Sequence, residues 1–167
     1  MNRILSPFLD RLPLPLRSTL ELRLLAGLHI PMLAFASPRI LHLDEHSLEA
    51  MIPLTWRTRN HLGCMYFAAL AAGADCAAGL LALHLCRSRA PGTSIIFKSF
   101  SANFLRRSEG DVLFLCSAGQ AIAAAIDELV QSGKRVNLPV EVLASVPSKG
   151  PEPTARFVLE LSLKGKG

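Results

Sequence analysis

The sequence predicts an α+β domain in which an antiparallel sheet wraps around one long central helix. An apolar stretch of small residues, about 61–86, contains a single formal charge, Asp75, and predicts the helix. Apolar and polar residues alternate with a period of two in the flanking segments, which is typical of half-buried strands. Two strands precede the helix and four follow it, an order that favours antiparallel pairing over a doubly wound parallel sheet.

Length and composition fit one domain with its own core. The chain has 167 residues, half of them apolar, and a net charge of +5. The basic residues are dispersed, with one Trp and one Tyr beside them, so we expect no nucleic-acid partner. Four cysteines without metal-type spacing favour a reducing compartment and no metal site. With no evident secretory signal, we expect a cytoplasmic protein.

The N-terminal region is expected to be a helical extension, residues 1–34, packed on a domain that spans 35–167. Apolar residues recur at helical spacing in 1–12 and 16–30, and a loop is predicted from Pro31. The alternative role for this extension is contact with a membrane surface, which makes a peripheral membrane partner a second expectation.

The remaining elements follow from alternation and turn residues. A short helix is predicted over 120–132, closed by Gly133. The strands are predicted at 39–43, 47–55, 93–106, 111–117, around 136–142 and around 157–163.

One stripe of the central helix carries small residues. At 100° per residue, Asp75 shares a face with Cys64, Ala68, Ala71, Ala72, Ala78, Gly79, Ala82 and Cys86. Such a face lets a sheet, a second helix or a slender ligand approach closely. Tight packing and a narrow acyl groove therefore both remain open.

Asp75 is the most informative residue, because a carboxylate in an apolar helix is costly unless it has a partner. It is either an ion-paired or hydrogen-bonded group in a dimer interface, or a general base or nucleophile with a raised pKa. Its candidate partners are Arg57, Arg59, His61 and His84. A bilayer span by 62–86 is disfavoured, because it would place Asp75 near the bilayer centre at a cost of roughly 2.5–3.5 kcal/mol.

The expected helix entrance offers a second group of candidates. Gly63 is predicted at the helix start, where its N–H would be unpaired and able to polarise a carbonyl oxygen. Capping of the helix by Asn60 is the alternative. Cys64, beside His61, is interpreted as a buried small side chain rather than as a nucleophile.

Two motifs together resemble a known superfamily. One is Asn60-His61-Leu62-Gly63 opening a small-residue helix, and the other is Phe104-Leu105-Arg106-Arg107 followed by Gly110-Asp111 at a strand end. With them, residues 35–165 resemble the hotdog-fold thioesterase superfamily of the phenylacetic-acid-degradation type, and within it an uncharacterised branch known as a domain of unknown function.

The resemblance implies an acyl-CoA-thioesterase-like hydrolase acting on a hydrophobic acyl thioester, with coenzyme A as part of the substrate and no separate cofactor. It implies a homodimer joined edge to edge, with a tetramer as the alternative, and a pocket at the dimer interface. Gly63 N–H would hold the thioester oxygen, Asp75 would act as base, and Asn60 and His61 would position the substrate.

The implied substrate-binding residues are Cys64, Ala68, Ala71 and Ala72 along the groove, and Arg106 and Arg107 at the CoA phosphates. Active relatives carry the helix carboxylate about two turns after the helix-start glycine. Counted from Gly63, Asp75 lies a turn too far. A non-catalytic acyl- or lipid-binding protein is the rival hypothesis, and a hydratase or dehydratase using His61 is a third.

Overall fold

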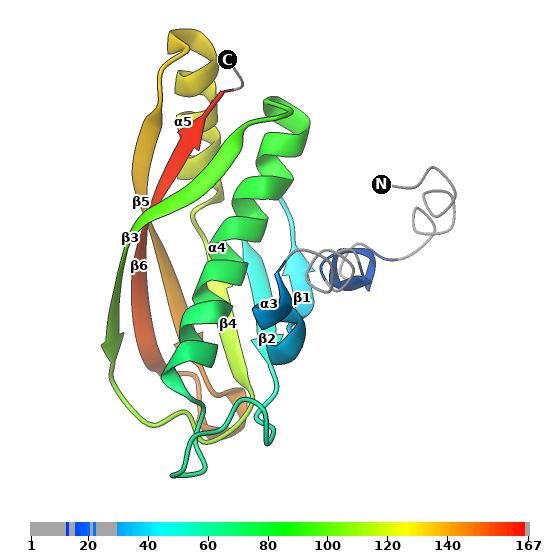
Figure 1. Cartoon of the computed structure of the whole chain (residues 1–167), viewed down its shortest axis with the longest axis vertical. Helices are drawn as coiled ribbons and strands as arrows, with labels where there is room; N and C mark the ends of the chain where they lie inside the picture. The colour runs from blue at the N-terminus through cyan, green and yellow to red at the C-terminus, as the bar shows by residue number, and fades with distance from the viewer. Residues whose placement is uncertain (1–12, 14–15, 21, 23–29, 166–167) are drawn as a thin grey trace.

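The predicted architecture is confirmed by the computed structural model, which describes residues 13, 16–20, 22 and 30–165. One six-stranded antiparallel sheet curls around a long helix, α4 (Phe67–Arg89) (Figure 1). The strands are β1 (Arg39–Leu43), β2 (Leu48–Ile52), β3 (Ser94–Phe104), β4 (Val112–Cys116), β5 (Val136–Ser145) and β6 (Pro153–Lys164), in the spatial order β1-β2-β4-β5-β6-β3. The other helices are α3 (Pro31–Ala36), α5 (Gly119–Ser132) and a short 3₁₀ turn, η1 (Pro147–Lys149).

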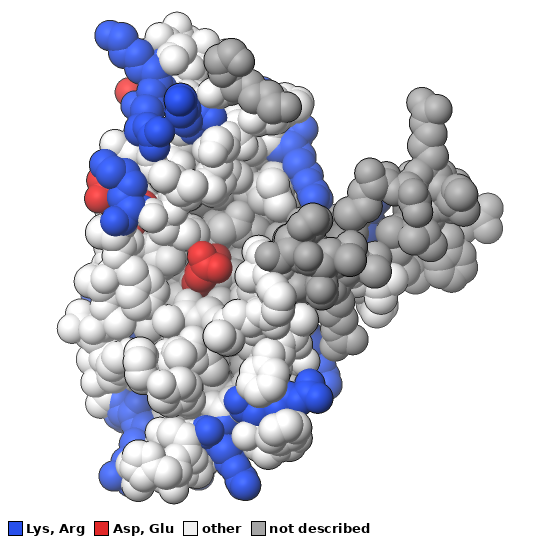
Figure 2. Space-filling view, in the orientation of Figure 1, with Lys and Arg blue, Asp and Glu red and all other residues white. Residues whose placement is uncertain are grey.

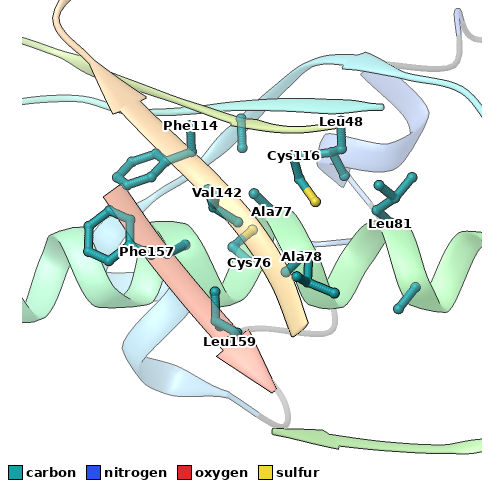
Figure 3. Packing of buried hydrophobic residues seen from close by; sticks show 14 of the residues in the cluster. Leu48, Cys76, Ala77, Ala78, Leu81, Phe114, Cys116, Val142, Phe157 and Leu159 are labelled. Atoms are coloured by element: carbon teal, nitrogen blue, oxygen red, sulfur yellow. The ribbon is translucent and has the colours of Figure 1, made fainter. Parts of the chain in front are cut away.

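The core lies between α4 and the concave face of the sheet. Figure 3 shows Ala77 and Leu81 of α4 pointing among side chains from several strands, including Phe114 of β4. Gly73 lets the helix approach closely, because a Cβ at this position would lie 2.2 Å from the Phe114 ring. The small residues that face the sheet therefore have a packing role.

The strand β3 forms one edge of the sheet. It pairs with β6 on one side, and no other described strand pairs with it on the other. Ile96, Phe100 and Phe104 of this strand are exposed, although Phe100 and Phe104 also contact the buried Phe157 ring. A long edge with exposed apolar side chains is a template for pairing with another chain.

The helix α4 begins at Phe67, six residues later than predicted. The segment before it forms a loop, so Asn60, His61, Gly63 and Cys64 lie outside the helix. Of the described helices, α4 alone has the length and hydropathy of a bilayer span. Most of its apolar window, 61%, is buried inside the protein, as in a core helix.

The N-terminal region differs from the prediction at one point. Residues 31–36, predicted as a loop, form α3, because Pro31 occupies the first turn of the helix, where its missing N–H is not needed. Residues 16–20 and 22 are helical, as expected, and Thr19 Oγ1 accepts a hydrogen bond from Ile40 N–H at 2.8 Å. The helix predicted over 1–12 lies outside the described residues.

Candidate active site

The loop between β2 and α4 is held by the side chain of Asn60. Its Oδ1 accepts hydrogen bonds from Leu62 N–H at 2.9 Å and Cys64 N–H at 3.3 Å, and its backbone N–H donates to Cys64 O at 2.8 Å. Asn60 therefore shapes this loop and does not cap α4, contrary to the predicted alternative. The residue at the N-cap is Tyr66, without a side-chain cap.

Gly63 does not supply the predicted free donor. Its N–H donates to Asn60 O at 3.1 Å within the turn. Its φ of +80° is a left-handed conformation that favours glycine, which explains this residue type at the turn. The prediction that Gly63 opens the helix and holds a thioester oxygen is thus wrong in its geometry.

The unpaired donors at the helix start belong to Phe67 and Ala68. The preceding N–H groups are used: Met65 donates to Ser108 O at 2.8 Å and Tyr66 donates to Thr58 O at 2.7 Å. Within the described structure, the N–H groups of Phe67 and Ala68 have no acceptor. They lie at the positive end of the helix dipole, which suits a carbonyl oxygen that gains negative charge.

A first cavity, of about 530 Å³, opens beside this helix start. It brings together residues from the two sequence motifs, as the resemblance implied: Asn60, His61, Cys64, Arg106 and Arg107 all line it. Arg106 is exposed and forms an ion pair with Glu152 at 3.4 Å, and Arg107 is exposed. Cys64 is buried, with its Sγ 3.4 Å from Asn60 Oδ1, as a wall residue.

A second cavity, of about 630 Å³, lies further along the seam between α4 and β3. Asp75 is its charged lining residue. The other lining residues are mostly apolar: Leu22, Ile30, Leu33, Cys76, Gly79, Leu80, Leu83, Thr93, Ile95, Ile96 and Phe97. The structure therefore separates Asp75 from the entrance residues and places it in a cavity of its own.

Asp75 has no hydrogen-bond or ion-pair partner among the described residues, so none of the four predicted partners binds it. Its side chain reaches the surface, yet the surrounding apolar atoms raise the pKa of the carboxyl group. The neighbouring Cys76 is buried, and desolvation together with the Asp75 charge raises the pKa of its thiol to about 12. Cys76 is thus an inert neighbour, whereas Asp75 has the character of a base.

Because α4 begins at Phe67, the position of Asp75 along the helix is counted from this residue. From Phe67 to Asp75 is eight residues, or a little over two turns at 3.6 residues per turn. The resemblance implied about two turns between the helix-start glycine and the acid. Counted from Phe67 instead of Gly63, Asp75 lies at about this separation, but Phe67 is not a glycine.

The small-residue stripe divides into two parts. Ala78, Ala82 and Cys86 are buried in the core. The uncovered part consists of Ala68, Ala71, Ala72, Asp75 and Gly79, which are partly or fully exposed. Neither cavity is lined by Ala68, Ala71 or Ala72, so in a single chain these three do not form the predicted groove.

Figure 2 shows this face of the molecule. Its middle is almost without charge, and Lys and Arg side chains gather toward its two ends.

The sequence did not predict the residues that line the apolar cavity, such as Leu80, Ile96 and Phe97, because they come from both sides of the seam between α4 and β3. Among the described residues, no cluster of three or more His, Cys, Asp or Glu side chains could hold a metal ion.

The fold is shared with solved structures. The chain is similar to a protein of unknown function from Chlorobaculum tepidum, OLEI01261, with a TM-score of 0.77 and 16% identity over 91% of this chain and 97% of the other. It is similar to PA5026 from Pseudomonas aeruginosa, described as a probable thioesterase, with a TM-score of 0.74 and 22% identity over 93% and 99%.

A third solved structure is the thioesterase HI1161 from Haemophilus influenzae, with a TM-score of 0.60 and 16% identity over 80% of this chain and 82% of the other. These likenesses show that the chain has a hotdog fold. No curated protein matches the chain. The family model for a domain of unknown function, DUF4442, matches residues 21–152, and the chain belongs to this family.

Proposed function

We propose that the protein hydrolyses hydrophobic acyl thioesters at a dimer interface. The observation that carries this proposal is Asp75, an unpartnered carboxylate with a raised pKa in an apolar cavity, two helical turns from unpaired N–H groups. A base and a pair of oxyanion donors are the two elements that hydrolysis of a thioester requires.

One chain cannot bring these elements to one carbon atom. Along α4, Phe67 and Asp75 are separated by about 12 Å, from eight residues at 1.5 Å each. In an antiparallel helix pair related by a two-fold axis level with Ala71, Asp75 of one protomer lies level with Phe67 of its partner. The small side chains of Ala71 and Ala72 permit the close approach that this pairing needs.

The edge strand supports the same pairing. The strand β3 is eleven residues long, and no described strand pairs with its outer edge. Its exposed Ile96 lines the second cavity together with Asp75 and Gly79 of the uncovered stripe. Its exposed Phe104 lines the first cavity beside Phe67. Pairing of two β3 edges would continue the sheet across the dimer and cover both apolar surfaces. We therefore place the two-fold axis at the seam between α4 and β3.

In the proposed reaction, the thioester oxygen accepts hydrogen bonds from the Phe67 and Ala68 N–H groups of one protomer. Asp75 of the other protomer takes a proton from water, and the resulting hydroxide attacks the thioester carbon. Collapse of the tetrahedral intermediate breaks the carbon–sulfur bond, and the proton passes from Asp75 to the leaving thiolate. The products are a carboxylic acid and free coenzyme A.

The two cavities accommodate the two parts of the substrate. Arg106 and Arg107, at the mouth of the first cavity, suit the CoA phosphates, which arginine binds with paired donors. The apolar second cavity suits the acyl chain. His61 lines the first cavity, where it can contact the pantetheine arm.

Thiol release from a series of acyl-CoAs tests the proposal. We expect turnover by the wild type and a loss of at least 10²-fold in kcat for Asp75→Asn, as for removal of a general base. Glu128→Gln, an exposed acid on α5, is the matched control and should keep full activity. Full activity of Asp75→Asn would remove this residue from the mechanism.

The dimer is tested separately by sedimentation. Ala71→Arg inserts a charge where we place the two-fold axis and should yield inactive monomers. Ala124→Arg, on the exposed side of α5, should remain a dimer with normal activity. A wild-type monomer with full activity would exclude a shared site.

The second candidate is a non-catalytic acyl-binding protein. One observation favours it: among the described residues that line the cavity, only Asp75 and Thr93 carry a charge or a hydroxyl group, so few of these side chains could orient a water molecule. It predicts saturable binding of acyl-CoA without thiol release at any chain length. A hydratase would instead hydrate an enoyl-CoA, which an absorbance assay detects.

A further inference from the structure

A second surface lies at the lower end of the molecule, outside the proposed catalytic site. The loop between β2 and α4 projects beyond the sheet at this end (Figure 1). It carries the chain's only tryptophan, Trp56, which is 71% exposed. Phe35, at the end of α3, is 47% exposed and lies edge-on to Trp56, with ring centroids 6.3 Å apart.

Arginines accompany these rings. The guanidinium of Arg57 lies 5.2 Å from the centroid of the Trp56 ring and 5.6 Å from that of Phe35. Arg59 is exposed in the same loop, and Leu62 near its tip is 59% exposed. No Asp or Glu occurs between residues 51 and 74, so no acid of this segment neutralises the two arginines.

We propose that this aromatic–arginine patch, formed by Phe35, Trp56, Arg57, Arg59 and Leu62, binds the surface of an anionic lipid bilayer. Tryptophan and phenylalanine settle at the boundary between headgroups and acyl chains, and arginines attract anionic headgroups. This inference does not depend on the proposed function.

The shape of the patch favours a bilayer over a protein partner. Its apolar side chains stand on a projecting loop and a short helix, and none of them lines either cavity described above. A helical protein partner needs a groove for its apolar face, whereas a bilayer takes up projecting side chains. The opposite end of this face also carries basic residues, but no tryptophan (Figure 2).

Docking in this way would bring the first cavity to the membrane. Asn60 and His61 belong to the same loop as Trp56 and line that cavity. An amphiphilic acyl ligand that partitions into the bilayer would then reach the cavity without crossing bulk water.

Trp56 itself reports on this contact, because it is the only tryptophan. Full-length protein is mixed with vesicles of phosphatidylglycerol or of phosphatidylcholine, and tryptophan emission is recorded. We expect a blue shift, and quenching by lipids that carry a quencher on the acyl chain, with phosphatidylglycerol only. The shift should decrease as salt is raised.

Matched variants locate the surface by vesicle flotation. Arg57→Gln and Arg59→Gln should each weaken binding about fivefold, whereas Lys134→Gln, in the exposed turn after α5 at the other end, should not. Trp56→Gln should also weaken binding, with the exposed Val130→Gln on α5 as its control.

Two results would overturn the proposal. Binding that is equal in all variants would place the contact on another segment. Absence of binding to anionic vesicles would leave an acidic protein as the candidate occupant of the patch. Thiol release from soluble acyl-CoA is measured without vesicles, so either failure is distinguishable from failure of the proposed function.

Discussion

If the second cavity holds the acyl chain, as we propose, its length predicts which acyl chains the protein accepts. The cavity follows α4 from Asp75 to Leu83, eight residues, or about 12 Å at 1.5 Å per residue. An extended acyl chain with carbon–carbon bonds of about 1.5 Å advances about 1.25 Å per carbon. The cavity thus accommodates about nine or ten carbons beyond the thioester.

Gly79 lies halfway along this path, so substitutions at this position test the prediction. A Cβ at Gly79 would lie 3.5 Å from the nearest atom of the Phe97 ring, an ordinary contact, so alanine fits. The longer side chain of leucine would extend across the cavity and leave about 6 Å, or about five carbons. Both substitutions should preserve the helix, because glycine is the poorer helix former by about 1 kcal/mol.

The expected loss in kcat/KM follows from the number of methylenes that no longer fit into the cavity. Excluding about four methylenes at about 0.8 kcal/mol each removes about 3 kcal/mol of binding, or about 10²-fold in kcat/KM. We expect this loss for Gly79→Leu with decanoyl-CoA. Octanoyl-CoA, which loses about two methylenes, should show a smaller loss of about 15-fold, and butyryl-CoA should change little. Gly79→Ala should resemble the wild type. The assay is kcat/KM across the chain-length series.

Two results would refute this reasoning. An equal loss at every chain length would show that the leucine disturbs the reacting groups rather than the acyl chain. Undiminished activity on decanoyl-CoA would show that the chain lies elsewhere. Thermal unfolding of both variants checks that the comparison concerns folded protein.

Four further outcomes are expected. Asp75→Asn should raise Tm at pH 7. Because the pKa of the Asp75 carboxyl is raised in the folded protein, its ionisation above the ordinary pKa of 3.8 lowers the stability of the fold. Calorimetry should show that the gain in Tm vanishes below pH 3.8. Wild-type thiol release should decrease as the pH is lowered through that raised pKa. Gly73→Ala should destabilise by about 1–3 kcal/mol in urea unfolding, because its Cβ would overlap the Phe114 ring. Arg107→Ala should raise KM for acyl-CoA but not for the acyl-pantetheine that lacks its nucleotide.

The fold could be predicted because its signals are local. Alternation and turn residues placed all six strands, and the apolar run placed α4. The start of α4 could not be placed, because Leu62, Met65 and Tyr66 continue the apolar character of the helix into the loop. The positive φ of Gly63 and the hydrogen bonds of Asn60 keep this segment in a loop, and the composition of the segment reveals neither of them.

The candidate site was predictable in part for a similar reason. Asp75 is evident because a lone carboxylate in an apolar helix needs an explanation. The Phe67 and Ala68 donors are backbone groups, and no residue type marks them. They become evident only once the hydrogen bonds of Met65 and Tyr66 show where the loop's own donors are used.

The small-residue stripe gains a more specific interpretation from these positions. As an acyl groove it should line a cavity, yet Ala71 and Ala72 line neither. They lie midway between the Phe67 donor and Asp75, which is where two antiparallel helices must come closest if each is to supply what the other lacks. The proposed two-fold dimer would give one explanation to three features of the described residues: the small side chains at that level, the unpaired apolar edge of β3 and the unpartnered Asp75.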